Sequence, residues 1–392
     1  MSPGVPLWQT GDNDGELTAL LVDDTRRLVE VESPSADLTA IGACAATVTE
    51  WASALLGRKP DVLTVDGRPH LRWRWPSHSG GGRVLMLCHF DTVWPLGTLA
   101  TMPCRVDGAF LRGPGCYDMK AGLAMTVRAI TQVRDAVGPD ALAGLTLLCT
   151  SDEEVGSVSS RHLIIDAATH ADAALVMEAA GPKGEWKTAR KGVGMFHVAV
   201  SGRAAHAGVE PLNGVNATVE LAHQVLAVTA LADWKAGTSV VPTLASSGTT
   251  VNTVPARADL RIDCRAWTVD EMERVSAGMH ALTPVLPGAV VEVEGGINRP
   301  PMESALADQV YQRAVNVAQA LGMRSPGRCS VGGGSDGNFT AGAGTPTLDG
   351  LGPVGGGAHA DEEHLLLAEL APRTRVLAAI LSDLLRSPLA SW

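Results

Sequence analysis

The chain lacks the cysteine patterns of a disulfide framework or of a cysteine-based zinc site. It has seven cysteines, an odd number, and no CxxC pair. Small secreted disulfide domains and structural zinc modules depend on such pairs, so neither class is expected. Cys88 and Cys149 lie in apolar runs and are interpreted as small core residues. This cysteine usage indicates a reducing compartment, and the chain is predicted to be cytoplasmic.

A surplus of positive charge is also missing, because the formal net charge is -11. Proteins that bind nucleic acid or anionic membranes favour basic surfaces, so neither is expected as a partner. An anionic substrate remains allowed, since local charge can oppose the global balance. No N-terminal segment joins a basic start to an apolar stretch, and no apolar run reaches spanning length, so neither a signal peptide nor a transmembrane helix is predicted.

The length and composition indicate a folded chain with a full core. Its 392 residues are enough for two or three domains, and 45% of them are hydrophobic, enough for a full core. Residues 1–15 are polar and are predicted to be a frayed tail. Residues 16–56 carry apolar positions at helical spacing, and helices are also predicted at 309–321 and near the C-terminus.

Buried strands and helices alternate through the first half of the chain. The apolar runs at 83–88, 145–150 and 173–177 are typical of strands buried on both faces. Helices are predicted at 119–137, where Gly138-Pro139 ends the pattern, and at 159–168. Strands that alternate with helices predict an α/β fold with a mostly parallel sheet.

The pattern changes from residue 192 to residue 299. Alternating strands and two amphipathic helices follow the order strand–helix–strand–strand–helix–strand, which is typical of a ferredoxin-like α+β domain. We therefore predict a catalytic domain formed by residues 16–191 and 300–392, with an inserted lid and dimerisation domain at 192–299.

Four candidate metal ligands lie just past predicted buried strands or open the helix that follows one. Ligand sites in open α/β sheets form at that edge, and carboxylates buried there need a partner or a metal. Imidazole with carboxylates suits zinc, and a later histidine is the natural fifth ligand. Taken singly, each motif is also typical of a structural histidine or a solvated turn. The candidates are His89, Asp118, Glu154 and Glu178, with His359 as the fifth.

Taken together, the motifs resemble the M20 family of zinc peptidases and amidohydrolases. They are HFDTV, GPGCYDMKAG, SDEEVGS, a lone Glu after an apolar strand, GRAAHAG, GGGSD and a late AHADEE. The resemblance runs from about residue 20 to the C-terminus and is strongest to the glutamate carboxypeptidase branch. It implies two Zn²⁺ ions, with Co²⁺ or Mn²⁺ as substitutes in vitro. His89 and Glu178 would bind one ion, Glu154 and His359 the other, and Asp118 would bridge them, followed by a cis peptide.

The resemblance also implies catalytic roles for two acids. Asp91 would hold the His89 imidazole as a supporting carboxylate. Glu153 would be the general base, which takes a proton from water and passes it to the leaving nitrogen.

Substrate-side residues follow from the same resemblance. His206 in GRAAHAG is similar to a histidine that reaches across a dimer to stabilise the oxyanion in the partner's site, although a loop histidine satisfied locally remains an alternative. The remaining candidates would bind the substrate carboxylate or line the lid, through guanidinium groups or closely spaced backbone N–H groups. They are Asn252, Arg265, Arg299, Gly333, Gly334 and Ser335. For these the alternatives are a surface charge at Arg265 and a plain turn at the glycines.

One segment departs from the glutamate carboxypeptidases. In that branch a lysine shortly after the fourth ligand helps to recognise the glutamate side chain of the substrate. Here Lys183 and Lys187 flank the expected place, but Glu185 and Trp186 can occupy it, which puts glutamate specificity in doubt. Three tryptophans near predicted pocket segments indicate either an apolar acyl side or core packing. They are Trp94, Trp186 and Trp267.

The predicted function is hydrolysis of the amide bond of an N-acyl amino acid or short peptide with a free C-terminal carboxylate. Such small molecules are the expected substrates, and a homodimer through the lid domain is the expected assembly. An aminoacylase, deacetylase or dipeptidase of the same family is the main alternative, because fold and ligands do not separate these activities. Two alternatives are more distant. One is a non-catalytic metal-binding protein, and the other is a monomer, whose site would lack the histidine of a partner subunit.

Overall fold

The structure is a computed structural model that describes residues 13–323 and 325–389. These residues form two compact units. Unit 1 comprises the described residues up to Thr188, then Ser304–Ser330 and those from Ser335 onward; unit 2 comprises Ala189–Glu303 and Val331–Gly334. The predicted bounds of the inserted domain, 192–299, lie within unit 2. Residues 1–12 of the predicted tail are outside the described residues, and the first helix already begins at Asp14.

Unit 1 is built on a six-stranded sheet with the order β1-β2-β6-β3-β7-β14. Neighbouring strands from β6 to β14 are parallel, which confirms the predicted α/β class, and β1 and β2 add an antiparallel edge. The strands are β1 (Asp61–Val65), β2 (Arg68–Arg74), β3 (Val84–His89), β6 (Leu145–Thr150), β7 (Ala173–Val176) and β14 (Thr347–Leu348).

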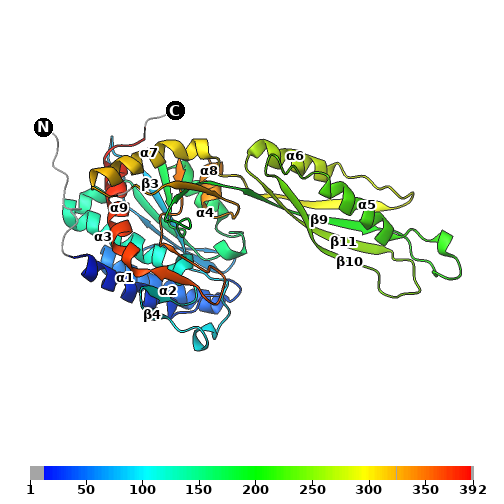
Figure 1. Ribbon diagram of the computed structural model, residues 1–392, viewed down its shortest axis with the longest axis horizontal. Helices are drawn as coiled ribbons and strands as arrows, with labels where there is room; N and C mark the ends of the chain where they lie inside the picture. The colour runs from blue at the N-terminus through cyan, green and yellow to red at the C-terminus, as the bar shows by residue number, and fades with distance from the viewer. Residues whose placement is uncertain (1–12, 324, 390–392) are drawn as a thin grey trace. The chain divides into compact units, whose positions relative to one another are not determined.

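Helices cover both faces of this sheet (Figure 1). The larger core cluster joins α1, α2, α3 and α9 to one face, and a smaller cluster beneath α4 and α8 covers the other. The helices are α1 (Asp14–Val29), α2 (Leu38–Leu56), α3 (Ala121–Val137), α4 (Arg161–Thr169), α7 (Ser304–Ala320), α8 (Gly337–Gly342) and α9 (Leu367–Arg386).

Three predicted helices begin at other residues than expected, and one of them, α4, begins at Arg161 rather than 159. Helix α3 begins at Ala121 rather than 119, because Cys116–Lys120 forms a separate wide turn in which Asp118 and Met119 leave the helical conformation. Helix α7 begins at Ser304, five residues before the predicted start.

Helix α2 is long and apolar enough to pass a test for a membrane span, with a mean hydropathy of 1.2. That test is weak, because core helices of globular proteins also pass it. Here Ile41, Cys44 and Val48 of α2 are fully buried in the main core cluster. We therefore interpret α2 as a core helix.

Two small sheets complete unit 1 and its boundary. One has the order β15-β16-β5-β4, and the other pairs β13 with β8. Their bounds are β4 (Arg105–Asp107), β5 (Phe110–Arg112), β8 (Trp186–Arg190), β13 (Arg328–Val331), β15 (Gly355–Gly356) and β16 (His364–Leu366).

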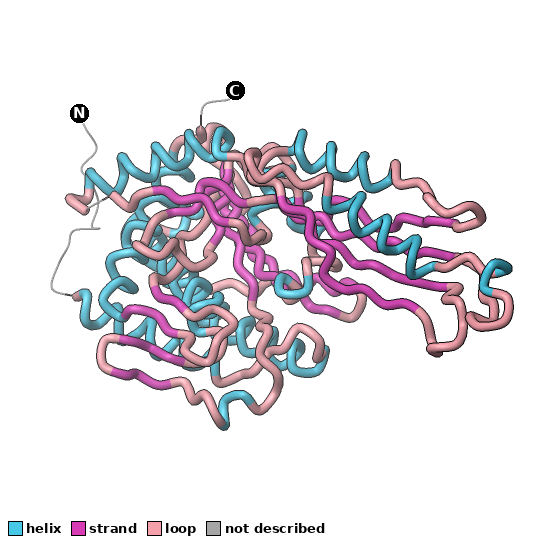
Figure 2. Tube along the Cα trace, turned by 45° about the vertical axis from the view of Figure 1, so that its right-hand side comes forward, coloured by secondary structure: helices cyan, strands magenta, loops and turns pink. Residues whose placement is uncertain are grey.

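Unit 2 is a four-stranded antiparallel sheet with the order β10-β11-β9-β12. Its elements follow the predicted order, so the ferredoxin-like pattern is confirmed: β9 (Gly192–Ser201), α5 (Ala217–Thr229), β10 (Ser239–Ser247), β11 (Arg257–Ala266), α6 (Val269–His280) and β12 (Val290–Arg299). Alternate residues of β9 and β11, such as Val198 and Leu260, are buried with the inner sides of α5 and α6. The two helices run along the sheet in both views (Figures 1 and 2).

Candidate metal centre

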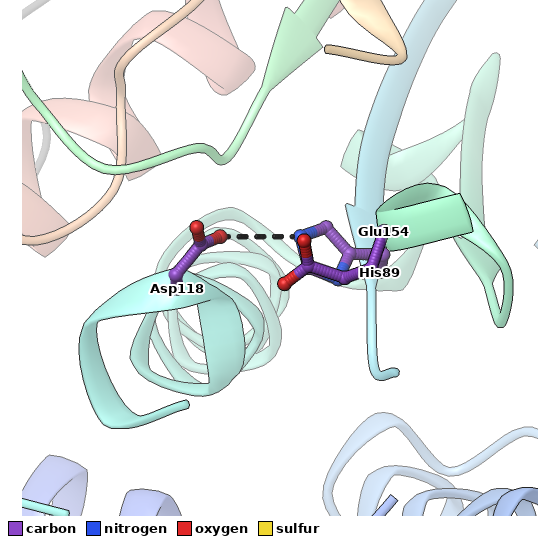
Figure 3. A group of neighbouring side chains, drawn as sticks. All are labelled: His89, Asp118 and Glu154. Atoms are coloured by element: carbon purple, nitrogen blue, oxygen red, sulfur yellow. Dashed lines mark ion pairs between the residues drawn. The ribbon is translucent and has the colours of Figure 1, made fainter. Parts of the chain in front are cut away.

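Five side chains from separate elements of unit 1 converge at the carboxyl end of its parallel strands. His89 ends β3, Asp118 lies in the turn before α3, and Glu154 lies in the short helix Glu153–Val155 that follows β6. Glu178 follows β7, and His359 lies between β15 and β16. We refer to these five residues as the metal centre. Figure 3 shows the Asp118 carboxylate directed at the His89 imidazole, with Glu154 beside them.

The carboxylate of Asp118 divides the metal centre into two halves. Its Oδ1 lies 3.3 Å from His89 Nε2, which is also 3.6 Å from Glu178 Oε1. Its Oδ2 lies 3.4 Å from His359 Nε2, which is 3.2 Å from Glu154 Oε2. Ligands bound at about 2.0–2.2 Å to a tetrahedral zinc ion lie about 3.3–3.6 Å apart. Three of the four distances lie in that range and the fourth, 3.2 Å, lies just below it, so each half has a spacing that a metal ion such as zinc would fit.

The buried nitrogen of His89 supports this interpretation. Its Nε2 is buried and makes no hydrogen bond within the part of the chain that the structure describes. The other ring nitrogen, Nδ1, contacts the backbone oxygen of Asp91 at 3.0 Å and Asp91 Oδ1 at 3.4 Å. A partner on Nδ1 fixes the ring and leaves Nε2 as the free donor, which is how metal-ligating histidines are held. The residues present thus fit a metal ion.

Asp91 links the histidine to the acidic turn on the next strand. Its carboxylate is fully buried and accepts hydrogen bonds from Ser35 Oγ at 2.6 Å and from the backbone N–H groups of Glu153 and Glu154 at 3.2 Å each. One carboxylate therefore fixes both an imidazole and the turn that carries the other two acids.

Glu153 lies near the His89 half of the metal centre. One carboxylate oxygen of Glu153, one ring nitrogen of His89 and one carboxylate oxygen of Glu178 all lie within 4.8 Å of one another. The peptide bond between Asp118 and Met119 is cis, as the resemblance implied.

The charges of the metal centre shift one another's protonation. Burial acts to lower the pKa of His89, but the nearby carboxylates of Asp118 and Asp91 outweigh it and hold that pKa well above its usual value. Asp118 and Glu154 raise the pKa of His359 to about 10. Burial opposes ionisation of Asp118, yet the two histidines hold its pKa below the usual range. Burial raises the pKa of Glu154. The crowded acids are thus stabilised by positive charge, which a metal ion would supply.

Glu363 is a supporting residue that the sequence analysis missed. Its carboxylate is fully buried, and Oε1 accepts hydrogen bonds from the backbone N–H groups of Tyr117 at 2.9 Å and Asp118 at 3.0 Å. Oε2 accepts from Gly115 N–H at 2.8 Å and from the indole N–H of Trp94 at 2.9 Å. The three backbone donors belong to the loop that carries Asp118, so Glu363 fixes that loop, and the indole of Trp94 is bound to the same carboxylate. The motif AHADEEH showed the residue but gave no signal that distinguished it from its neighbours.

The GGGSD segment is divided between the two units. The hydroxyl of Ser335 donates to Asp349 Oδ2 at 2.7 Å, and its backbone N–H donates to Asn338 Oδ1 at 2.8 Å. The sequence motif predicts that this N–H binds a substrate carboxylate, but in the structure it already donates to the side chain of Asn338. Gly333 and Gly334 belong to unit 2, where their carbonyls accept from Arg190 Nη1 at 3.0 and 3.4 Å.

The other predicted substrate-side residues lie in unit 2. His206 and Asn252 are exposed and come from neighbouring segments, because the N–H of Ala207 donates to the carbonyl of Asn252 at 2.9 Å. The guanidinium of Arg265 forms a bidentate pair with Asp263, with both Nε and Nη2 at 2.9 Å from the carboxylate. Arg299 ends β12 and is 5% exposed.

The three tryptophans have different environments. Trp186 is 2% exposed and packs edge-on against Tyr311, so core packing accounts for it. Trp267 lies under the ammonium group of Lys191 in unit 2. Trp94 alone is tied to the metal centre, through Glu363.

Comparisons with known proteins agree with this geometry. Residues 85–383 match the model of peptidase family M20/M25/M40. Carboxypeptidase G2 from Pseudomonas sp. (strain RS-16) is 32% identical over 307 residues, which are 76% of this chain and 73% of that protein. Succinyl-diaminopimelate desuccinylase from Thioalkalivibrio sulfidiphilus is 25% identical over 350 residues, or 81% and 89%.

The fold is also that of solved structures. The crystal structure of aminopeptidase PepT from Bacillus cereus superposes with a TM-score of 0.71 at 24% identity, covering 93% of this chain and 98% of that one. Because the family model spans well over half of the chain, the protein is a hydrolase that belongs to the M20/M25/M40 family of metallopeptidases.

Proposed function

We propose that the protein is a dizinc hydrolase that cleaves the amide bond of an N-acyl amino acid or short peptide bearing a free C-terminal carboxylate. The observation that carries the proposal is the bridging position of Asp118, whose two oxygens face separate histidine–glutamate pairs. The carboxypeptidase name of one relative supports the carboxylate-bearing substrate.

The chain's own residues would divide the reaction as follows. His89 and Glu178 would hold one zinc ion, Glu154 and His359 the other, and Asp118 both. When bound, the two ions would supply Lewis-acid chemistry that activates water and polarises the scissile carbonyl. A carboxylate oxygen of Glu153 would accept the proton from the attacking water and pass it to the leaving nitrogen. Asp91 would keep Glu153 in position by accepting a hydrogen bond from its backbone N–H.

Substrate recognition would fall to unit 2. Arg265 and Arg299 suit a carboxylate through bidentate pairing, and Gly333 and Gly334 offer backbone N–H groups. Asn252 would add an amide. Ser335 would support the loop from unit 1, since its own N–H is already bonded.

We also propose a homodimer through unit 2, with His206 stabilising the oxyanion in the partner's site. Apolar side chains on α5, on the edge strand β10 and in the loop after it support this: Leu226 is 71% exposed, Leu244 is 70% exposed, and Val251 is fully exposed. Unpaired apolar surface of this kind is typical of an interface. Sedimentation velocity would test the proposed dimer, and a monomer would contradict it.

We propose a cytoplasmic location as well, and the seven free cysteines support it.

A sibling activity is the second candidate, because one relative is named a desuccinylase. An aminoacylase, deacetylase or dipeptidase would use the same metal centre with a different pocket. A panel of acyl-glutamates, acyl-lysines and dipeptides, given to the zinc-loaded protein, would separate these activities. Glu153→Ala is the inactive control, and Glu50→Ala, an exposed acid on α2, is the matched control that should stay active. Failure of the whole panel would favour a non-catalytic metal-binding protein and overturn the proposal.

A further inference from the structure

A second feature of unit 1 lies at the opposite ends of the parallel strands from the metal centre. A hollow of about 570 Å³ is lined by the basic side chains of Arg58, Lys59, Arg72, Arg74, Arg83 and His170, which we call the basic hollow. Arg83 directly precedes β3, and His170 precedes β7, so the basic hollow lies at the amino ends of strands whose carboxyl ends carry the metal ligands. Strand β3 has six residues, and at about 3.3 Å for each residue its two ends lie about 20 Å apart.

The positive charge of the basic hollow is only partly neutralised. Arg72 pairs with Asp61 at 3.2 Å, Arg83 pairs with Asp172 at 2.5 Å, and His170 is 3.8 Å from Asp166. Among the residues that the structure describes, Arg58, Lys59 and Arg74 have no carboxylate partner. The Arg58 guanidinium lies over the ring of Trp75 at 5.7 Å, which orients it without neutralising it. Three cations thus remain uncompensated in a chain whose net charge is -11.

Helix ends explain only part of this cluster. Arg58 and Lys59 follow the C-terminus of α2, and His170 follows that of α4, where positive charge is favoured by the helix dipole. Arg72 and Arg74 lie instead on β2, two residues apart and therefore on one face of the strand. The Nε of Arg72 is buried and has no hydrogen-bond acceptor among the described residues. A buried donor without an acceptor costs free energy, so the pair with Asp61 leaves the Arg72 guanidinium incompletely satisfied.

We propose that the basic hollow binds a small polyanion that carries phosphate groups. Guanidinium groups match phosphate oxygens bidentately, and Arg58 and Arg74 are free to do so. The three uncompensated cations balance three of the negative charges of such a ligand. The volume lies within the ~300–1,000 Å³ of small-molecule sites, which suits an inorganic polyphosphate or the triphosphate of a nucleotide. This inference is independent of the proposed hydrolase function, because it concerns the opposite ends of the strands.

The test is isothermal titration of the zinc-loaded protein with tripolyphosphate and, separately, with ATP. The variant is Lys59→Glu/Arg74→Glu, in which both side chains are exposed and unpaired, so that folding should be preserved. The matched control, Arg27→Glu/Lys235→Glu, changes exposed residues elsewhere and carries the net charge from -11 to -15, as the variant does. Each pair replaces one lysine and one arginine, so the two proteins differ only in where the charge was reversed.

We expect one saturable site in the wild type and in the control, and binding at least tenfold weaker in the variant. Polyphosphates also chelate zinc, but that effect would appear equally in all three proteins, and metal analysis after the titration measures it. Equal affinities for tripolyphosphate and ATP would assign recognition to the phosphates, whereas tighter ATP binding would add a contact to the base. Absence of binding to the wild type, or equal binding to all three proteins, would overturn the proposal. Circular dichroism of the variant verifies its fold.

Discussion

The metal centre in unit 1 and the residues of unit 2 that are proposed to bind substrate differ in how their side chains are held. At the metal centre, Asp91 and Glu363 alone accept seven of the hydrogen bonds that fix the ligand-bearing loops. In unit 2, His206 and Asn252 are exposed, and Arg265 is paired with a neighbour on its own strand. The residues proposed for bond cleavage are therefore held in place before substrate arrives, whereas those proposed for recognition are exposed or paired with a neighbour that substrate would have to replace.

This difference separates two kinds of constraint on the sequence. Burying several carboxylates in one place is stable only with a defined set of partners, so unit 1 must specify each of them. An exposed histidine such as His206 exchanges water for substrate at little cost, and the half-buried Arg265 would exchange its neighbour Asp263. Substitutions of the metal-centre residues in unit 1 should therefore affect metal content and turnover, and those of the arginines in unit 2 should mainly affect substrate affinity. His206 differs from the arginines, because its proposed role at the oxyanion would make it affect kcat.

The largest effect is expected from removing the shared carboxylate. Asp118→Ala takes one ligand from each half of the metal centre, so we expect both zinc ions and all measurable turnover to be lost. Glu154→Ala affects one half, and one tightly bound ion should remain. Plasma mass spectrometry of dialysed protein measures the metal-to-protein ratio. Retention of two ions by Asp118→Ala would show that Asp118 does not bridge.

Removing the proposed base should separate chemistry from metal binding. In Glu153→Ala we expect kcat to fall by roughly 10²–10⁴-fold or more, the contribution of general acid–base catalysis, with both ions retained. Turnover with the best substrate of the panel and metal analysis on the same sample provide the two values. Near-normal kcat in this variant would remove Glu153 from the mechanism.

The supporting residue Glu363 should affect metal affinity without touching the metal. Both of its oxygens accept hydrogen bonds, so in Glu363→Gln the amide NH₂ would face donors and disturb the Asp118 loop. We expect zinc affinity to fall by about 10–100-fold, as for other supporting residues of metal sites. Competition with a chromogenic chelator measures it, and the exposed neighbour variant Glu362→Gln serves as the control. Unchanged affinity in Glu363→Gln would limit this residue to a packing role.

The smallest effects should come from the paired arginine of unit 2. If Arg265 binds the substrate carboxylate, Arg265→Ala should raise KM by about tenfold, the loss of one charge-assisted hydrogen bond, with a smaller change in kcat. Asp263→Ala frees the guanidinium and should lower KM. Steady-state kinetics of both variants decides the point, because a purely structural ion pair would leave KM unchanged in each and lower the melting temperature of both.

Much of the fold and of the metal centre could be predicted from the sequence, for a physical reason. Parallel strands buried on both faces are continuous apolar runs, and their polar ends are conspicuous, so β3, β6 and β7 and the residues after them were identified together. Strands β1 and β2 were missed, because they form an edge in which charged residues such as Arg72 and Arg74 interrupt the apolar pattern.

Other features depend on contacts between distant parts of the chain. Glu363 lies 245 residues after the Asp118 that it supports, and nothing local distinguishes it from Glu362. The inward position of Ser335 follows from Asp349 and Asn338, which the GGGSD motif does not contain. Trp186 and Trp94 carry the same side chain, and only tertiary packing assigns one to the core and the other to the metal loop.

Anomalous X-ray scattering at the zinc edge from crystals of the zinc-loaded protein would test the metal centre most directly. Two peaks about 3.5–4 Å apart are expected. One should lie beside His89 and Glu178, the other beside Glu154 and His359, with one oxygen of Asp118 on each. A single peak, or zinc bound away from Asp118, would contradict the two-metal account.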